Sequence, residues 1–264
     1  MSITDKVIVL DLDETLVCVT EEMGVYKELG IDQIPNLRKN CFVMDLDDPV
    51  DFRGTGKHNS FWGIRRPHLR EFLIFCFSYF KAVIVWSAGA DRYVEAIVKE
   101  IFSGIADPHL VYARSKCVTD ARARNHKPLS KMIRDEPGLS QYMSLSNTFA
   151  IDDKTSTYID NPENGIQIPV YEPAFRISSL SSDDIGLLQL KDWLLRPDIS
   201  GSTDVRTLDK SRIFEQPLSS PSFGACYISP ETGTMICSSE SKDEKTDDNL
   251  EMLRSALKSL EVGA

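Results

Sequence analysis

The sequence predicts an α/β fold: a doubly wound parallel sheet with a small β-hairpin insertion and no large cap domain. Three short apolar runs, Val7–Leu10, Lys81–Ser87 and Asn147–Asp153, are typical of parallel strands that are covered on both faces. Segments with helical spacing separate these runs, and strands that alternate with helices indicate a parallel sheet. Folds of this kind bind their ligands at the carboxyl ends of the strands.

The first half of the chain contains two of these strands and the insertion. Residues 20–40 are polar and are predicted to be irregular. Cys41–Leu46 and Ser60–Arg65 are predicted strands of a hairpin, joined by the turn-rich residues 47–59. Pro67 fits the first turn of a helix. The apolar residues of that helix follow helical spacing: Leu69, Phe72, Leu73 and Cys76.

The second half continues the alternation. Asp91 is predicted to open an amphipathic helix, and Leu129–Ile133 a shorter one. Leu110–Ala113 and Gly165–Val170 are predicted strands, and a helix preceded by capping residues is expected over Ser181–Leu195. The folded domain is therefore predicted over residues 1–196.

Residues 197–264 are predicted to form a partly disordered extension. Residues 198–224 are polar and rich in serine, and residues 238–248 are almost wholly Ser, Asp, Glu and Lys. Two short apolar segments, 225–229 and 234–238, predict a hairpin between these stretches. A terminal helix is predicted from four leucines at helical spacing: Leu250, Leu253, Leu257 and Leu260.

Composition narrows the class of protein. The net charge of −10 argues against direct nucleic-acid binding, which favours a basic face. The six cysteines are scattered without metal-ligand spacing, which favours free thiols in a reducing compartment. Phe72–Trp86 is too short to cross a bilayer and contains Lys81, and no room for a signal peptide precedes the Val7 strand. We expect a soluble intracellular protein of the cytoplasm or nucleus, with no membrane partner; the oligomeric state is not predicted.

Polar groups follow the predicted strands. Asp11 and Asp13 come directly after the first strand, Ser87 ends the second, and Asp152 and Asp153 end the third. Two carboxylates this close repel each other unless a divalent cation binds both. A solvated turn explains either acidic pair taken alone, and Ser87 has a simpler interpretation as a cap of the following helix.

Together with Lys127, these residues supply what phosphoryl transfer needs. A carboxylate nucleophile forms an aspartyl-phosphate, and a second carboxylic group donates and later accepts a proton. A hydroxyl and an ammonium hold the phosphoryl oxygens, and magnesium neutralises the remaining charge. By itself, Lys127 has the simpler interpretation of a surface lysine.

The ordered motifs resemble the haloacid-dehalogenase superfamily, and within it the phosphatases that act on the RNA polymerase II C-terminal domain. The resemblance covers roughly residues 5–195 and rests on these segments in order: DLDETLV (Asp11–Val17), RRPHLREFL (Arg65–Leu73), VIVWSAG (Val83–Gly89), YARSKC (Tyr112–Cys117), Lys127 and IDDKTSTYIDNPENGI (Ile151–Ile166). Three details depart from the branch: Ser87 replaces threonine, Trp86 replaces phenylalanine, and Pro-Leu follows Lys127. None of these changes removes a catalytic group.

The resemblance implies a Rossmann-like phosphatase with bound Mg²⁺. It makes Asp11 the nucleophile and Asp13 the general acid and base, with Ser87 and Lys127 binding the phosphoryl group. One Asp11 oxygen and the Asp13 carbonyl then bind the metal. Asp152 and Asp153 complete the metal site, directly or through water, and which of the two binds directly is left open. Arg114 is left open between a substrate contact and a salt bridge.

The short insertions favour an open site and a phosphorylated protein or peptide as substrate, with phosphoserine or phosphothreonine as the hydrolysed group. Residues 18–66 and 88–126 have room for little more than a hairpin and a helix–strand unit, by ordinary element lengths. Two alternatives stay open. One is a phosphatase for small molecules or nucleic-acid ends, and the other is a catalytically weak binding module that docks partners through residues 198–264.

Overall fold

The computed structural model describes residues 3–47, 58–218, 227–228 and 235–236. The chain divides into two compact units, Met1–Ser219 and Ser220–Ala264. In the second unit, β11 (Tyr227–Ile228) pairs antiparallel with β12 (Met235–Ile236), where the sequence predicts a hairpin. The predicted terminal helix and the acidic stretch at 238–248 lie outside the described residues. No helix within the described ranges is both long and apolar enough to span a bilayer.

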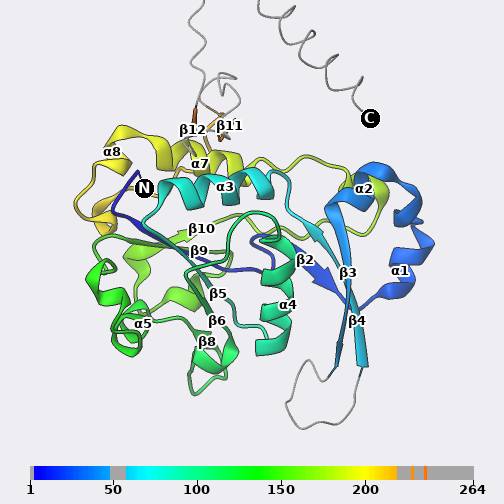
Figure 1. Ribbon diagram of the computed structural model, residues 1–264, viewed down its shortest axis with the longest axis horizontal. Helices are drawn as coiled ribbons and strands as arrows, with labels where there is room; N and C mark the ends of the chain where they lie inside the picture. The colour runs from blue at the N-terminus through cyan, green and yellow to red at the C-terminus, as the bar shows by residue number, and fades with distance from the viewer. Residues whose placement is uncertain (1–2, 48–57, 219–226, 229–234, 237–264) are drawn as a thin grey trace, which may run out of the picture. The chain divides into compact units, whose positions relative to one another are not determined.

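A five-stranded parallel sheet forms the centre of the first unit (Figure 1). The strand order is β10 (Gly165–Gln167), β9 (Thr148–Asp152), β1 (Val7–Leu10), β5 (Ala82–Trp86) and β6 (Leu110–Tyr112). The chain runs outward from β1 to β5 and β6, then returns to the other side of β1 for β9 and β10, so the strand order reverses beside β1. This is the doubly wound fold that the sequence predicts.

Alternate residues of β1 pack into different cores, because successive side chains of a strand point to opposite faces. Ile8 and Leu10 lie in one core, which also contains buried residues of α3 (Leu69–Tyr79), α4 (Asp91–Ile101) and α7 (Gly186–Leu195). Val7 and Val9 lie in the other, with residues of α5 (Leu129–Asp135) and the 3₁₀ helix η3 (Leu139–Gln141). Figure 1 shows α3 and α7 on the opposite side of the sheet from α5.

The insertion after β1 is larger than the predicted hairpin. β3 (Cys41–Asp47) and β4 (His58–Arg65) pair as predicted, and β2 (Val17–Thr20) adds a third antiparallel strand beside β4. The expectation that residues 20–40 are irregular is wrong. They form α1 (Met23–Glu28), η1 (Ile31–Gln33) and α2 (Pro35–Asn40), and each of these elements buries only one residue, so no apolar repeat marks them. Residues 48–57 of the predicted turn lie outside the description.

Several short elements complete the first unit. β7 (Val118–Thr119) and β8 (Asn125–His126) form a hairpin that the sequence does not predict. The predicted Ser181 helix begins later, at Gly186, because the short helix α6 (Ile177–Leu180) ends before it and the Asp184 carboxylate accepts the Gly186 amide proton. The remaining short elements are η2 (Arg114–Lys116), η4 (Thr155–Tyr158), η5 (Pro162–Asn164), α8 (Pro197–Ser200) and η6 (Val205–Thr207).

The first unit extends beyond residue 196, where the sequence places the end of the folded domain. Ile199, Val205 and Ile213 are buried in the same core as α7. Three apolar residues among many polar ones give no periodic pattern, which explains why the sequence alone assigns this stretch to the extension.

Candidate active site

Asp11 lies at the point where the strand order reverses. Its backbone amide donates to the Ile151 carbonyl at 3.0 Å, which extends the parallel pairing of β1 with β9 by one step. The register pairs Leu10 with Ile151, so Asp11 and Asp152 occupy the next positions of adjacent strands, which run about 4.8 Å apart in a sheet. Loops diverge at such a reversal and leave a crevice, which is where open α/β sheets bind ligands.

Lys127 reaches both of these carboxylates. It follows β8, and its amide donates to the Thr157 carbonyl at 2.5 Å. Its Nζ lies 2.5 Å from Asp11 Oδ1 and 2.6 Å from Asp152 Oδ2, and all three side chains are buried. Burial alone lowers the pKa of Lys127, but the charges of Asp11 and Asp152 outweigh burial and raise the pKa. The ammonium is therefore charged at neutral pH.

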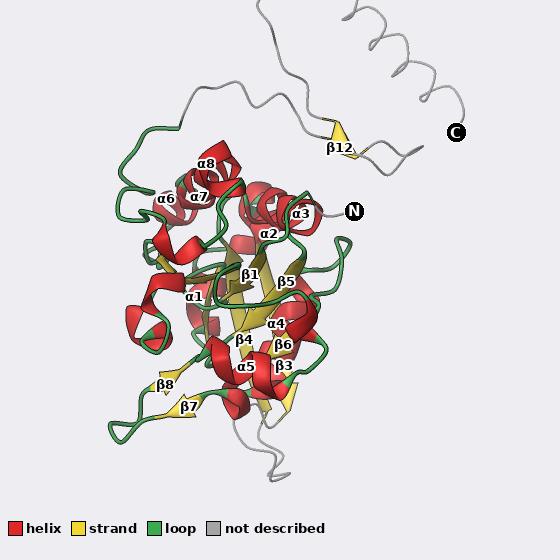
Figure 2. Cartoon of the chain, turned by 90° about the vertical axis from the view of Figure 1, so that its left-hand side faces the viewer, coloured by secondary structure: helices red, strands yellow, loops and turns green. Residues whose placement is uncertain are grey.

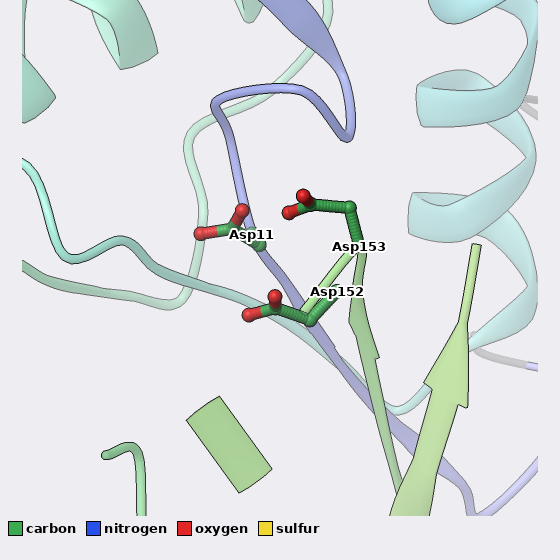
Figure 3. Close-up of side chains that lie close together, drawn as sticks. All are labelled: Asp11, Asp152 and Asp153. Atoms are coloured by element: carbon green, nitrogen blue, oxygen red, sulfur yellow. The ribbon is translucent and has the colours of Figure 1, made fainter. Parts of the chain in front are cut away.

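The side chains of Asp11, Asp152 and Asp153 converge at this edge of the sheet (Figure 3). One oxygen from each lies within 4.8 Å of the others. Both side-chain oxygens of Asp153 are buried and have no hydrogen-bond partner among the described residues, although the Lys154 ammonium lies 3.6 Å from Oδ2. Burial raises the pKa of Asp153, with Lys154 opposing the rise and Asp152 adding to it. A buried carboxylate without a donor is costly unless a ligand satisfies it.

The charges of this cluster do not balance. Three buried carboxylates face one buried ammonium, and burial raises the pKa of Asp11 even though Lys127 opposes the rise. Magnesium prefers carboxylate oxygens and keeps several waters, so three converging acids fit it. The donor set and the unpartnered oxygens of Asp153 therefore fit a divalent cation. They leave open which of Asp152 and Asp153 binds it directly.

Asp13 faces a second group of polar residues. Glu14 adopts a left-handed conformation (φ 59°), and the Leu16 amide donates back to the Leu12 carbonyl at 2.8 Å, so the chain turns sharply after Asp13. The Asp13 carboxylate accepts hydrogen bonds from the Tyr93 hydroxyl and, at 3.4 Å, from the Ser87 hydroxyl. Burial raises the pKa of Asp13, and the Tyr93 hydrogen bond opposes the rise. A raised pKa suits a group that must donate a proton.

Tyr93 is a residue that the sequence analysis missed. It lies in the first turn of α4, six residues after Ser87, and its ring lies close to Gly89: a Cβ at Gly89 would sit 2.9 Å from Tyr93 Cδ1 and 3.2 Å from Ser87 Oγ. The Gly89 amide donates to Ser87 Oγ at 2.9 Å. A search for polar residues in the first turn after each strand end would have found Tyr93.

Arg114 lies against the same loop. Its Nε donates to the Ala88 carbonyl at 2.8 Å, and its amide donates to the Gly89 carbonyl at 2.9 Å. Within the part of the chain that is described, no carboxylate pairs with its guanidinium. Of the two interpretations of Arg114, the salt bridge therefore lacks a partner there.

A second buried charge holds the loop that carries the acids. Arg66 is fully buried and donates from Nη1 to the Thr15 carbonyl at 3.0 Å. Its other nitrogens pair with the Asp184 carboxylate at 2.7 and 3.1 Å. Thr15 Oγ1 in turn accepts the Asp153 amide proton at 3.2 Å. Arg66 therefore connects the loop after β1 with α7 and with the end of β9.

The sequence profile of the NLI interacting factor-like phosphatases matches residues 6–206. The chain belongs to this family. The family match agrees with the resemblance found in the motifs. Curated relatives of this chain are named as C-terminal-domain (CTD) phosphatases or as CTD phosphatase-like.

Two groups of relatives and one solved structure illustrate the likeness. Ubiquitin-like domain-containing CTD phosphatase 1 of Pongo abelii and of Homo sapiens is 26% identical over 200 residues, which is 73% of this chain and 60% of theirs. The chain thus spans about 60% of the length of these relatives. Putative CTD phosphatase-like protein 355R of Invertebrate iridescent virus 3 is 25% identical over 196 residues, 72% of this chain and 95% of its own.

The solved structure is a variant of the fission yeast RNA polymerase II CTD phosphatase Fcp1 bound to beryllium fluoride. It superposes with a TM-score of 0.50 at 19% identity, covering 69% of this chain and 44% of the chain in that structure. At that identity the likeness concerns the fold, and it agrees with the parallel sheet and flanking helices described above.

Proposed function

We propose that this protein is a magnesium-dependent phosphatase that hydrolyses phosphoserine or phosphothreonine in proteins, through an aspartyl-phosphate on Asp11. One observation carries the proposal: the Asp11 carboxylate lies 2.5 Å from a buried ammonium, beside two further buried acids at the edge where the strand order reverses. Family membership and the names of the relatives support it.

Each residue has a part in the two half-reactions. An Asp11 oxygen attacks phosphorus and forms a new P–O bond while the bond to the serine or threonine oxygen breaks. Asp13 gives its proton to that leaving oxygen and then takes a proton from the water that attacks the aspartyl-phosphate. This second attack releases inorganic phosphate and restores Asp11. Asp11, the Asp13 carbonyl, and Asp152 and Asp153, directly or through water, would hold a Mg²⁺ ion. When bound, the ion would neutralise part of the phosphoryl charge.

Lys127 and Ser87 would hold the phosphoryl oxygens. The Lys127 ammonium now bridges Asp11 and Asp152, so an incoming phosphoryl group replaces carboxylate contacts with equivalent ones. Ser87 Oγ already accepts the Gly89 amide proton, which leaves its own O–H free to turn from Asp13 towards a phosphoryl oxygen.

The proposed substrate is a phosphorylated protein segment similar to the C-terminal domain for which the relatives are named. In its described part, the insertion at residues 17–65 is a three-stranded sheet with two short helices, so we infer that the site stays open to an extended peptide. An action on phosphoproteins of the cytoplasm or nucleus follows from this proposal. An enclosed small-molecule site needs more cover.

The test is hydrolysis of para-nitrophenyl phosphate with and without Mg²⁺. We expect turnover that EDTA abolishes and Mg²⁺ restores, and a loss of at least about 10³-fold in Asp11→Asn, because the amide is not a nucleophile. Asp183→Asn is the matched control, since Asp183 is exposed and, among the described residues, its one ion pair is with His68. Substantial residual activity in Asp11→Asn with an unchanged circular dichroism spectrum would remove the nucleophile assignment.

A substrate comparison tests the protein class. We expect phosphoserine and phosphothreonine peptides to have higher kcat/KM values than sugar phosphates or nucleic acid with a terminal phosphate. A preference for sugar phosphates by orders of magnitude would contradict the open-site inference while leaving the chemistry of Asp11 intact.

A further inference from the structure

One segment beside the site has the opposite charge to the rest of the protein. Residues 114–126, here called the basic arm, comprise η2, β7 and β8 and contain four cationic side chains and one acidic one, in a chain of net charge −10. The cations are Arg114, Lys116, Arg122 and Arg124, and all four are exposed. Figure 2 shows the β7–β8 hairpin projecting from the body of the first unit.

Both ends of the basic arm are fixed to the candidate site. At its start, the Arg114 amide donates to the Gly89 carbonyl, and Cys117 Sγ lies 3.9 Å from the Ser87 carbonyl oxygen. At its end, His126 pairs with Val118 and is followed at once by Lys127. The arm therefore begins beside one predicted phosphate-binding residue and ends at the other.

One cation of the arm is used to shape it. The Asp120 carboxylate accepts the Arg122 and Arg124 amides at 2.8 and 2.9 Å and the Arg124 Nε at 2.8 Å. These bonds hold the pKa of Asp120 at about 2, with the backbone bond from Arg124 as the largest cause, so the turn stays charged and closed at neutral pH. Asp120 thus neutralises Arg124 and fixes the hairpin end.

Two other cations have no such partner. Within the described residues, no carboxylate pairs with Lys116 or Arg122. The Lys116 ammonium lies 5.3 Å from the centre of the Tyr112 ring, which orients it without neutralising it. Exposed charges on a preformed hairpin beside a site attract oppositely charged ligands.

We propose that the basic arm is a docking surface for acidic residues that flank the phosphorylated residue in a peptide substrate. The proposal rests on the proposed phosphatase function and narrows its substrate class. Strands advance about 3.3 Å per residue, so Arg122 lies at most about 17 Å along the chain from Lys127. An extended peptide that places its phosphoserine at Lys127 therefore presents residues about three to five positions away to the arm. Those residues carry carboxylates or further phosphates.

Steady-state kinetics on matched phosphoserine peptides tests this. The peptides carry alanine, glutamate, lysine or a second phosphoserine three to five positions away, on either side. We expect kcat/KM for the glutamate and doubly phosphorylated peptides to exceed that of the alanine peptide by about fivefold at low ionic strength, and the excess to shrink with salt. Glutamate and second-phosphate peptides distinguish the two sources of negative charge.

The decisive variant is Lys116→Ser/Arg122→Ser. It should reduce the excess to less than about twofold, with para-nitrophenyl phosphate turnover unchanged. The charge-matched control is Lys81→Ser/Arg196→Ser, which also removes two positive charges. Lys81 directly precedes β5, at the edge of the sheet opposite to the site. Arg196 follows α7, and the Leu194 carbonyl of α7 accepts the Tyr79 hydroxyl proton near that opposite edge. This control should keep the full preference.

Binding measurements separate a failure of the arm from a failure of the enzyme. Titration calorimetry of the same peptides with Asp11→Asn needs no turnover and should give the same order of affinities. The proposal is overturned if the protein binds acidic and neutral peptides equally, if the double variant keeps the preference, or if single-stranded RNA binds through the arm more tightly than acidic peptides. If the unaltered protein did not hydrolyse para-nitrophenyl phosphate, the proposed phosphatase function itself would be refuted.

Discussion

Two buried charged clusters lie along the same loop and differ in how their charges are matched. In the Arg66 cluster, one guanidinium meets one carboxylate, that of Asp184, through two hydrogen bonds and gives a third to a carbonyl. In the Lys127 cluster, one ammonium meets two carboxylates, and a third carboxylate, that of Asp153, has no hydrogen-bond donor within the part of the chain that the structure describes.

The difference separates structure from function. A buried ion pair whose donors and acceptors are all satisfied holds parts of a fold together, and removing one partner leaves an uncompensated buried charge. A buried cluster with surplus negative charge lowers the stability of the protein on its own and gains stability when a cation binds. We therefore expect variants of the two clusters to change stability in opposite directions in the metal-free protein.

The largest expected effect on stability is that of Asp184→Ala. This change leaves the Arg66 guanidinium buried without its carboxylate and removes the acceptor of the Gly186 amide at the start of α7. Because Asp184 is 28% exposed, we expect the lower end of the range for a broken buried pair, about 3 kcal/mol of unfolding free energy. Urea denaturation measures it. Asp183→Ala, at the exposed neighbouring residue, should cost less than about 0.5 kcal/mol.

The other half of the comparison is Asp153→Asn in EDTA. Removing a carboxylate that lacks a hydrogen-bond donor removes repulsion with Asp152, so the metal-free variant should be as stable as the unaltered protein or slightly more stable. If Asp153→Asn destabilised the metal-free protein as much as Asp184→Ala does, the two clusters would be equivalent and the distinction would fail.

The second prediction concerns Mg²⁺ itself. A cation that binds only the folded state stabilises the protein by about 1.4 to 2.7 kcal/mol when its free concentration is 10 to 100 times its Kd. Mg²⁺ should therefore raise Tm. Protons compete for the same carboxylates, so the gain should shrink as the pH falls. Asp153→Asn should lose most of the gain, and Asp183→Asn should keep it. Thermal unfolding that ignores Mg²⁺ in the unaltered protein would contradict the cation site.

The sequence predicts the strands and the site residues at their ends for one physical reason. Strands buried on both faces must be continuously apolar, so a run such as Ala82–Trp86 followed by a hydroxyl residue marks both a strand and its end. Parallel pairing then brings those ends to one edge without any further information. That is why Asp11 and the Asp152–Asp153 pair meet as their positions in the chain imply, whereas Lys127 reaches them from directly after β8, outside the parallel sheet.

The parts that the sequence does not predict depend on contacts between elements. The position of Tyr93 in the first turn after β5 is visible in the sequence, but its contact with Asp13 depends on the orientation of α4 over Gly89, which no local pattern encodes. The β7–β8 hairpin consists of two-residue strands, which are too short for any alternation to appear. The roles of Asp13, Ser87 and Lys127 in turnover stay predictions, since geometry alone does not report a reaction.

A smaller effect on activity than that of Asp11→Asn is predicted for Tyr93→Phe. This variant removes a matched hydrogen bond, as in the Arg66 cluster, but inside the site. Without the Tyr93 hydroxyl, the side-chain donor that the described residues still offer Asp13 is Ser87, at 3.4 Å, so the carboxylate is held less firmly towards the leaving oxygen. We expect kcat/KM for a phosphoserine peptide to fall about tenfold. Para-nitrophenyl phosphate, whose leaving group needs little protonation, should lose less than about threefold.

The dependence on the leaving group distinguishes positioning of Asp13 from a general loosening of the fold. The comparison uses kcat/KM because this constant reports the steps up to the transfer of the phosphoryl group to Asp11 and excludes the later hydrolysis of the aspartyl-phosphate, which both substrates share. Tyr26→Phe is the matched control: Tyr26 also donates to a carboxylate, Asp32, at 2.5 Å, but in the insertion. It should affect both substrates alike. Equal losses on both substrates in Tyr93→Phe would mean that Tyr93 supports the loop after β5 and leaves proton transfer by Asp13 unchanged.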